Sequence, residues 1–305
     1  MRALYDLPAP AKINAFLHIL GQRADGYHLL QSPFVLIDWV DTLHVELRLD
    51  GHLKRHDIGT SLPVDDLCLR AARALQTASG CLLGADISID KRVPWGAGLG
   101  GGSSDAATTL LALNRLWQLN WPRARLLPLA QSLGADIPFF VFGRNAFVEG
   151  IGEKLTPMSW ASSTYAVVKP AAPLSTQEIF SHARLKRDTE PVILLGSLEG
   201  CQGDPGTVQG SALWGGGFGR NDLQEPATDR CPEVALVASW LEERFGNSRM
   251  TGSGSAVFAR VDEFRSNPGA TCLPRATLPQ ESLPAAWVGR MCRSLQVHPL
   301  LEWAD

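Results

Sequence analysis

The clearest chemical signal in the chain lies in residues 94–104, where five of eleven residues are glycine. Because glycine has no Cβ atom, several backbone N–H groups can approach one anion closely. A helical pattern follows directly, so the unpaired N–H groups and the positive dipole end of its first turn would face the same anion. The segment therefore predicts a loop that binds polyphosphate, to which the hydroxyls of Ser103 and Ser104 could add donors.

Two common nucleotide-binding motifs do not account for this loop. Gly96, Gly98 and Gly101 satisfy G-x-G-x-x-G, but residues 106–135 contain no Asp or Glu that could bind a ribose hydroxyl, as a dinucleotide fold requires. No lysine follows the glycines, as a P-loop requires. A flexible glycine-serine linker is the remaining non-functional interpretation, and it fits poorly between a strand and a well-patterned helix.

An aspartate and a lysine elsewhere in the chain could complete a site for phosphoryl transfer. Asp136 lies in a short polar turn before an apolar segment, while Lys12 and Asn14 lie in an early, mostly apolar strand. Phosphoryl transfer needs a group that accepts or orients the proton of the attacking hydroxyl, and a cation to face phosphate charge. A carboxylate beside an ammonium group would supply both. Alone, such residues are more often turn or strand-edge residues, and their spacing does not bring them together.

The elements that must position these residues follow an irregular order of strands and helices. Strand periodicity is expected over residues 42–50, 85–90, 164–169 and 255–261, with an Asp-Gly turn over 23–28. Helical periodicity is expected over 65–79, over 232–245, and from an N-cap at Ser103 or Ser104 to Trp117. This order predicts an α+β fold, and residues 195–220 predict a long glycine-rich loop.

Composition narrows the class of protein. The 305 residues carry a net charge of −3, with 45% hydrophobic and 19% charged residues, which is ordinary for a globular protein. The absence of a basic excess argues against a nucleic-acid partner. No apolar run reaches the ~20 residues that span a bilayer, and the N-terminal residues resemble no secretory signal. We therefore expect a cytoplasmic protein without a membrane partner.

The six cysteines give no sign of a metal or redox site. They are far apart and form no Cys-x-x-Cys pair, so we expect reduced thiols and no metal-ligating residues. The cysteines are Cys68, Cys81, Cys201, Cys231, Cys272 and Cys292.

Three separate segments together resemble the motifs of the GHMP kinases. They are residues 10–14, the glycine-rich residues 94–104 with the Asp-Ala-Ala that follows, and residues 251–256. Residues 21–28 and 133–138 are similar to the members of this family that phosphorylate the 2-hydroxyl of a cytidine diphosphate-linked methylerythritol in isoprene biosynthesis. The resemblance extends from Pro10 to Leu300 and is weakest over residues 185–220.

The resemblance implies a role for each candidate residue. Asp136 would be the general base and Lys12 its charge partner, while Asn14 would contact the substrate near the reacting centre. Tyr27 and Phe180 would stack on the cytosine ring, and His28 would read its polar edge. The residues implied in ATP binding are Lys91, Pro94, Gly96, Gly98, Leu99, Gly100, Gly101, Gly102, Ser103 and Ser104.

The resemblance also implies an architecture, cofactors and partners. We expect a two-domain α+β kinase, with a ribosomal protein S5 domain 2-like N-terminal domain over residues 1–153 and a ferredoxin-like C-terminal domain over 154–305. The expected cofactors are ATP and Mg²⁺, the latter held mainly by phosphates and water. The expected partner is the small-molecule substrate, with the chain a monomer or a weak homodimer.

Two features depart from the family pattern, and three other functions remain open. Asp66 stands where relatives commonly have Asn, and residues 201–219 form a longer glycine-rich stretch. The first alternative is a GHMP kinase for another small alcohol, such as mevalonate or homoserine. The others are a non-catalytic nucleotide-binding sensor and, more distantly, a dinucleotide-dependent oxidoreductase.

Overall fold

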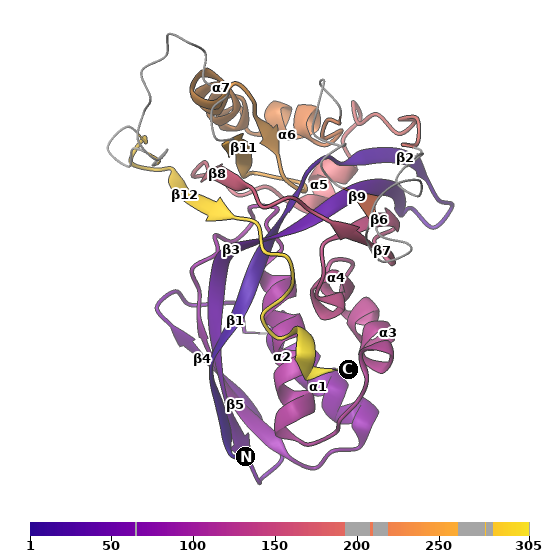
Figure 1. Ribbon diagram of the computed structural model, residues 1–305, viewed down its shortest axis with the longest axis vertical. Coiled ribbons are helices and arrows are strands. Elements are labelled where there is room, and N and C mark those ends of the chain that lie inside the picture. Colours follow the sequence, from indigo (N-terminus) through magenta and orange to yellow (C-terminus); the bar gives the residue numbers. More distant parts are fainter. Residues whose placement is uncertain (65, 193–207, 210–218, 262–277, 279–282, 305) are drawn as a thin grey trace.

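The computed structural model describes residues 1–64, 66–192, 208–209, 219–261, 278 and 283–304. Within them the chain builds two sheets and helices that cover them (Figure 1). The larger sheet contains β1 (Ala3–Asn14), β2 (His18–Gln22), β3 (His28–Arg48), β4 (Leu53–Ile58), β5 (Gly84–Asp90), β6 (Ala146–Gly150), β7 (Lys154–Ser159) and β9 (Val208–Gln209). The smaller sheet has the order β10 (Arg249–Met250), β11 (Val257–Val261), β8 (Thr164–Lys169), β12 (Val288–Arg293).

Strand β3 is the long central element of the larger sheet. Its C-terminal part pairs with β1 and β5, and its N-terminal part pairs with β2 and β6. All four pairings are antiparallel, whereas β4 lies parallel to β5 at the sheet edge. Because β3 pairs with other strands along its whole length, it fixes the position of β1 relative to the β2–β3 hairpin.

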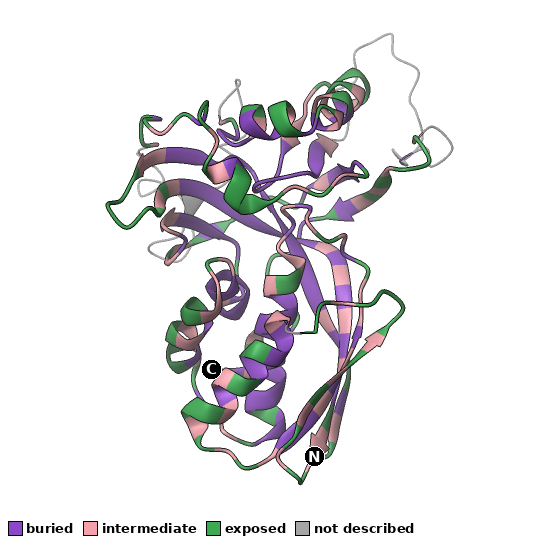
Figure 2. Cartoon of the chain, turned by 180° about the vertical axis from the view of Figure 1, so that it is seen from behind, coloured by how far each residue is buried: buried purple, intermediate pink, exposed green. Residues whose placement is uncertain are grey.

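Four helices cover one face of the larger sheet. They are α1 (Leu67–Ser79), α2 (Gly101–Leu116), α3 (Arg123–Leu133) and α4 (Ile137–Phe142). Helix α2 is buried along most of its length and packs against α1, α4 and β1 (Figure 2). Its buried residues include Asp105, Thr108 and Asn114 beside the apolar ones, so the helix belongs to the core, and this burial gives the residues at its N-terminus a fixed position.

The smaller sheet packs between two apolar layers. On one side, Tyr165, Val167 and Phe258 join the core formed with β1 and β3. On the other side, the sheet is covered by α6 (Gln224–Arg230) and α7 (Glu233–Phe245), while α5 (Thr176–Phe180) lies nearer the hairpin. No helix in the described ranges is long and apolar enough to cross a membrane.

The C-terminal residues return to the first half of the chain. After β12, Leu295 N donates to Leu36 O (2.8 Å), and Arg123 N donates to Ala304 O (2.7 Å) next to the short helix η3 (Leu301–Trp303). Strand β7 also pairs with β6 of the larger sheet. The division into domains after residue 153 stays a prediction.

The expected elements are confirmed, most of them with ends within two residues, but the strand expected over 42–50 is only the C-terminal part of the longer β3. The strands over 42–50, 85–90, 164–169 and 255–261 correspond to β3, β5, β8 and β11, and the helices over 65–79 and 232–245 to α1 and α7. The N-cap expected at Ser103 or Ser104 is wrong: α2 begins at Gly101, and Gly100 is its N-cap. Gly100 has φ +70°, a left-handed conformation that glycine adopts without strain, so the helix starts earlier. The loop over 195–220 lies largely outside the described residues.

Candidate active site

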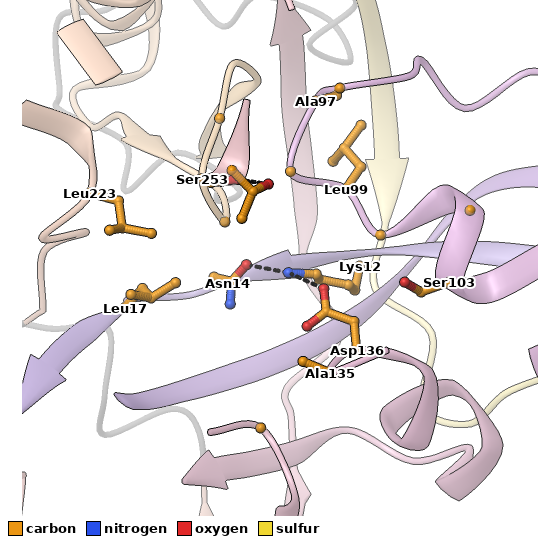
Figure 3. A pocket seen from close by; sticks show the side chains of 18 of the residues that line it. Lys12, Asn14, Leu17, Ala97, Leu99, Ser103, Ala135, Asp136, Leu223 and Ser253 are labelled. Atoms are coloured by element: carbon orange, nitrogen blue, oxygen red, sulfur yellow. Dashed lines mark hydrogen bonds and ion pairs between the residues drawn. The ribbon is translucent and has the colours of Figure 1, made fainter. Parts of the chain in front are cut away.

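A cavity of about 580 Å³ lies where β1, the glycine-rich loop, the start of α4 and the hairpin meet (Figure 3). Its lining includes all but one of the predicted site residues. The residues that line it are Lys12, Asn14, Tyr27, His28, Lys91, Pro94, Gly96, Gly98, Leu99, Gly100, Gly101, Gly102, Ser103, Asp136 and Phe180. Ser104 is the exception, because its side chain is fully buried inside the first turn of α2.

Lys12, Asn14 and Asp136 form the polar centre of the cavity. Lys12 Nζ lies 3.4 Å from Asp136 Oδ2 and donates a hydrogen bond of 2.6 Å to Asn14 Oδ1 (Figure 3). The ammonium also lies 4.4 Å from the centre of the Phe34 ring. Burial lowers the pKa of Lys12, and the Asp136 carboxylate opposes this shift. Lys12 is therefore no strand-edge residue but a buried cation held by a carboxylate.

The local sequence explains why these three side chains meet. Lys12 and Asn14 are two residues apart on β1, so they share one face of the strand. Asp136 occupies the N-cap position of α4, and Pro138 follows in its first turn, where the missing N–H costs nothing. The carboxylate makes no capping bond and its side chain is 33% exposed, so it remains available to a ligand.

The glycine-rich loop is held in place by two neighbouring segments. Lys12 N donates to Leu99 O (2.9 Å), while Ser255 N and Ala256 N donate to Gly96 O and Ala97 O. Glycine is required at Gly98, where φ is +73° and a Cβ would lie 2.2 Å from Thr251 O. The loop thus brings its backbone and the first turn of α2 to the cavity with little freedom to move.

Thr251 links the loop to the polar centre. Its hydroxyl accepts a hydrogen bond from Asn14 N (2.9 Å) and donates one to Asn14 Oδ1 (3.2 Å). Asn14 Nδ2 donates to Ser32 Oγ (2.8 Å), so the amide orientation is fixed from three sides. The Thr-Gly-Ser-Gly-Ser-Ala pattern marks this segment in the sequence, but nothing in the pattern predicts a role for Thr251 itself.

Lys91 is bound between two buried carboxylates. Its ammonium forms an ion pair with Asp41 and lies 2.6 Å from Asp105 Oδ2. Asp41 also accepts from Arg92 N (2.6 Å) and Val93 N (2.7 Å). Burial alone would lower the pKa of Lys91, but Asp105 and Asp41 outweigh it and raise that pKa. The lysine therefore lines the cavity and also ties α2 to β3.

The hairpin and α5 bring the three predicted base-binding residues, Tyr27, His28 and Phe180, to the same cavity. The ring centres of His28 and Phe180 lie 5.1 Å apart. Tyr27 is 60% exposed at the turn, where Arg23 N donates to Tyr27 O (2.8 Å) and Gly26 has φ +88°. Tyr27 therefore offers a free aromatic face beside a ring pair.

Asp66 has a structural role at the start of α1. Its carboxylate accepts from Leu69 N (3.0 Å) as the N-cap of that helix and lies 3.2 Å from Arg55 Nη1. Asp is as good an N-cap as Asn, so this departure from the family pattern preserves the helix start.

Sequence reasoning missed several residues that support the site. Asp41 and Arg187 contact predicted residues from distant parts of the chain and no local motif marks them, while Asp105 stands in the Asp-Ala-Ala of the glycine-rich motif but was given no role. The expectation of reduced thiols is met at Cys68, Cys81, Cys231 and Cys292, which are free. Cys201 and Cys272 lie outside the described residues.

Comparison with known proteins identifies the class. Residues 66–144 match the family described as GHMP kinases N terminal domain, and residues 201–276 match GHMP kinases C terminal. A homoserine kinase from Cytophaga hutchinsonii shares the fold, with a TM-score of 0.61 at 16% identity over 98% of this chain and 96% of that chain. The chain belongs to the GHMP kinase family and is a small-molecule kinase with ATP as phosphate donor.

Within that family, the relatives that match over full length at more than 50% identity include 4-diphosphocytidyl-2-C-methyl-D-erythritol kinases. The one from Methylibium petroleiphilum is 57% identical over 304 residues, covering 100% of this chain and 99% of the relative. The one from Variovorax paradoxus is 52% identical and covers 100% of both. A crystal structure of 4-(cytidine 5'-diphospho)-2C-methyl-D-erythritol kinase is 33% identical with a TM-score of 0.69, covering 85% of this chain and 90% of that chain.

Proposed function

We propose that the protein transfers the γ-phosphate of ATP to the 2-hydroxyl of 4-diphosphocytidyl-2-C-methyl-D-erythritol, a step in isoprenoid precursor biosynthesis. The observation that carries the proposal is the Lys12–Asp136 ion pair, which shares one cavity with the glycine-rich loop and the aromatic hairpin. The names of the full-length relatives support the same reaction.

The phosphate end of the cavity fits ATP. The backbone of residues 96–103 and the first turn of α2 supply N–H donors and the positive end of a helix dipole. Lys91 lines this end, and its two carboxylate partners offset its charge and hold its side chain in place near the nucleotide. Ser103 lines the cavity and can donate its hydroxyl, whereas Ser104 is buried and its N–H group donates to Gly100 O (2.9 Å), so Ser104 supports the start of the helix.

Asp136 acts as the general base of the proposed reaction. Its carboxylate accepts the proton of the substrate hydroxyl as that oxygen attacks the γ-phosphorus. Lys12 lies against this carboxylate, and its ammonium group faces the charge of the transferring phosphoryl group. Asn14 holds the ammonium through its Oδ1 atom and keeps one Nδ2 proton for the substrate, since the other is directed at Ser32.

The hairpin end of the cavity fits a cytosine ring. Tyr27 and Phe180 offer aromatic faces for stacking, and the Nδ1 atom of His28 offers a hydrogen bond to the base edge. Binding energy from this remote group would orient the reacting hydroxyl at the other end of the cavity.

Mg²⁺ would be bound mainly by the phosphates and by water. No group of three or more His, Cys, Asp or Glu side chains that could hold a metal occurs in the described ranges. Mg²⁺ in kinases binds few protein oxygens, and the hydroxyl of Ser103 in the cavity lining is one that would lie near it. The ion would offset negative charge on the phosphates.

We also propose the domain boundary, the place of substrate binding and the oligomeric state that the sequence led us to expect. The domains divide after residue 153, and the substrate binds in the cavity between residues from both. The protein works as a monomer or weak homodimer without a nucleic-acid partner, in keeping with its net charge of −3.

A panel of alcohols tests the proposed function. The purified protein with Mg-ATP should release ADP with 4-diphosphocytidyl-methylerythritol, and not with the uncytidylated 4-phosphate, mevalonate or homoserine. Turnover of another alcohol alone would overturn the substrate assignment. ADP binding without turnover of any alcohol would instead support a nucleotide sensor.

A further inference from the structure

Arg187 connects the two halves of the aromatic pocket. Its Nε atom donates to His28 Nε2 (3.0 Å), at the start of β3. One terminal nitrogen donates to Phe180 O (3.0 Å) and His182 O (3.3 Å), and the other donates to Leu185 O (3.1 Å). The guanidinium thus ties the end of α5 to the hairpin, and every one of its nitrogens is engaged.

The bond from Arg187 determines where His28 carries its proton. A guanidinium N–H can only donate, so Nε2 of His28 must accept. A neutral imidazole that accepts at Nε2 has its proton on Nδ1. Burial lowers the pKa of His28, and the charge of Arg187 lowers it further, so the neutral ring is favoured.

The other ring nitrogen is left for a ligand. His28 lines the cavity, and within the described part of the chain Nδ1 forms no hydrogen bond. An Nδ1–H group in this position can donate to a ligand and cannot accept from it.

We propose that Arg187 is a positioning residue that holds His28 as the Nδ1–H tautomer, and that this selects cytosine over uracil. The inference rests on the proposed function. Cytosine has a lone pair at N3, which accepts from Nδ1–H, whereas uracil has N3–H, which would face a second donor. A buried donor opposite a donor leaves both unpaired, and such mismatches give strong discrimination.

Arg187 also fixes the distance between His28, which would bind the edge of the base, and Phe180, which would stack on its face. It binds the His28 ring and the Phe180 carbonyl at once, and the two rings lie 5.1 Å apart. Loss of the guanidinium should therefore weaken base binding and leave the phosphoryl-transfer centre at Lys12 and Asp136 untouched.

Steady-state kinetics of Arg187 variants test the proposal, with cytidine- and uridine-linked methylerythritol diphosphates as substrates. Arg187→Met should raise KM for the cytidine compound about tenfold, the effect of one hydrogen bond, with kcat within about threefold. The cytidine preference should fall by about the same factor. Arg187→Lys, which keeps a donor, should recover part of both effects.

Arg184→Met is the matched control. Arg184 lies in the same segment but pairs with Asp229 (2.8 Å) and Glu225 on the surface. The Arg184→Met variant should leave KM for the cytidine compound and the preference for cytidine over uridine unchanged. Wild-type KM and wild-type preference in Arg187→Met would overturn the proposal.

A second measurement reads the tautomer of His28 in the wild-type protein itself. ¹⁵N NMR of the full-length wild-type protein at neutral pH, with His28 assigned by comparison with His28→Gln, should show a protonated Nδ1 and an unprotonated Nε2. The reverse tautomer would overturn the proposal. If the wild-type protein turns over no cytidine-linked alcohol, the proposed function fails, whereas the NMR result still decides the tautomer.

Discussion

Among single residues, Asp136 matters most to the proposed reaction, which requires its carboxylate to face the substrate hydroxyl. The carboxylate lies 3.4 Å from the buried ammonium of Lys12 and makes no capping bond to α4. An aspartate with only a structural role at a helix start would instead accept from the backbone of the first turn, as Asp66 does from Leu69 N.

Asp136→Asn removes the proton acceptor while keeping the size of the side chain. We expect kcat to fall ~10²–10⁴-fold, or about 3–5 kcal/mol of barrier, with KM for both substrates nearly unchanged. Steady-state assays of ADP release measure this effect. Asp6→Asn is the control, because the Asp6 side chain is 87% exposed and lies outside the cavity. Near-normal kcat in Asp136→Asn would exclude the residue as the base.

Sequence motifs predict the polar residues at the centre of the cavity better than the residues that hold the side chains around it in place. Lys12, Asn14 and Asp136 follow from motifs whose types suit phosphoryl transfer. Asp41 and Asp105, which bind Lys91, lie on β3 and α2, and only tertiary packing brings them together. A single buried carboxylate in a strand or helix has no pattern that distinguishes it from a surface residue.

Among the elements of the site, the glycine-rich loop is held in a fixed geometry by hydrogen bonds from β1 and from residues 255–256. Strand and helix periodicity predicted β5 and α2 on either side of it, but the helix start was placed too late. The pattern of apolar residues begins only at Ala107, whereas the backbone turns helical at Gly101 because Gly100 adopts a left-handed conformation. Periodicity reports buried side chains, and glycines carry none.

Gly98→Ala tests whether this loop positions the phosphates of ATP. The new Cβ would lie 2.2 Å from Thr251 O at φ +73°, so the loop must move. Displacement of this kind should lower kcat/KM for ATP by about 10²-fold.

Gly21→Ala is the matched control for this substitution. A Cβ at Gly21 meets no atom within 4 Å, and its φ lies outside the left-handed region. It should keep kcat/KM for ATP within about twofold of the wild-type value. An unaltered kcat/KM for ATP in Gly98→Ala would show that the close approach to Thr251 is not needed.

At the scale of the whole molecule, the C-terminal residues fasten the second half of the chain to the first. His298 N donates to Gly143 O (2.8 Å), and the buried ring accepts from Leu300 N (3.1 Å) at Nδ1. Burial lowers the pKa of His298 to about 3, and the charge of Arg123 contributes to this shift. The folded protein therefore holds this histidine neutral.

This buried histidine should make stability fall in mild acid. In the unfolded chain His298 binds a proton near its ordinary pKa of ~6.5, while the folded chain does not until about pH 3, so the unfolded state gains protons first. Between pH 7 and 5 this costs about 2 kcal/mol of unfolding free energy. His298→Asn should lose about 2 kcal/mol less over that range in urea denaturation.

The exposed His52 provides the control, because its side chain is 72% exposed. His52→Asn should keep the pH dependence of the wild-type protein. Equal pH dependence in wild type and His298→Asn would contradict the burial argument.

The position of the transferred phosphate in the product shows whether the 2-hydroxyl of the substrate is the group that is phosphorylated. The 2-carbon of the methylerythritol unit bears no hydrogen, so a phosphate on its oxygen has no three-bond coupling to a proton. ³¹P NMR of the product formed with Mg-ATP should therefore show a new monoester signal without that coupling. A split monoester signal, which marks transfer to the 1- or 3-hydroxyl, or the absence of a new signal, would contradict the account.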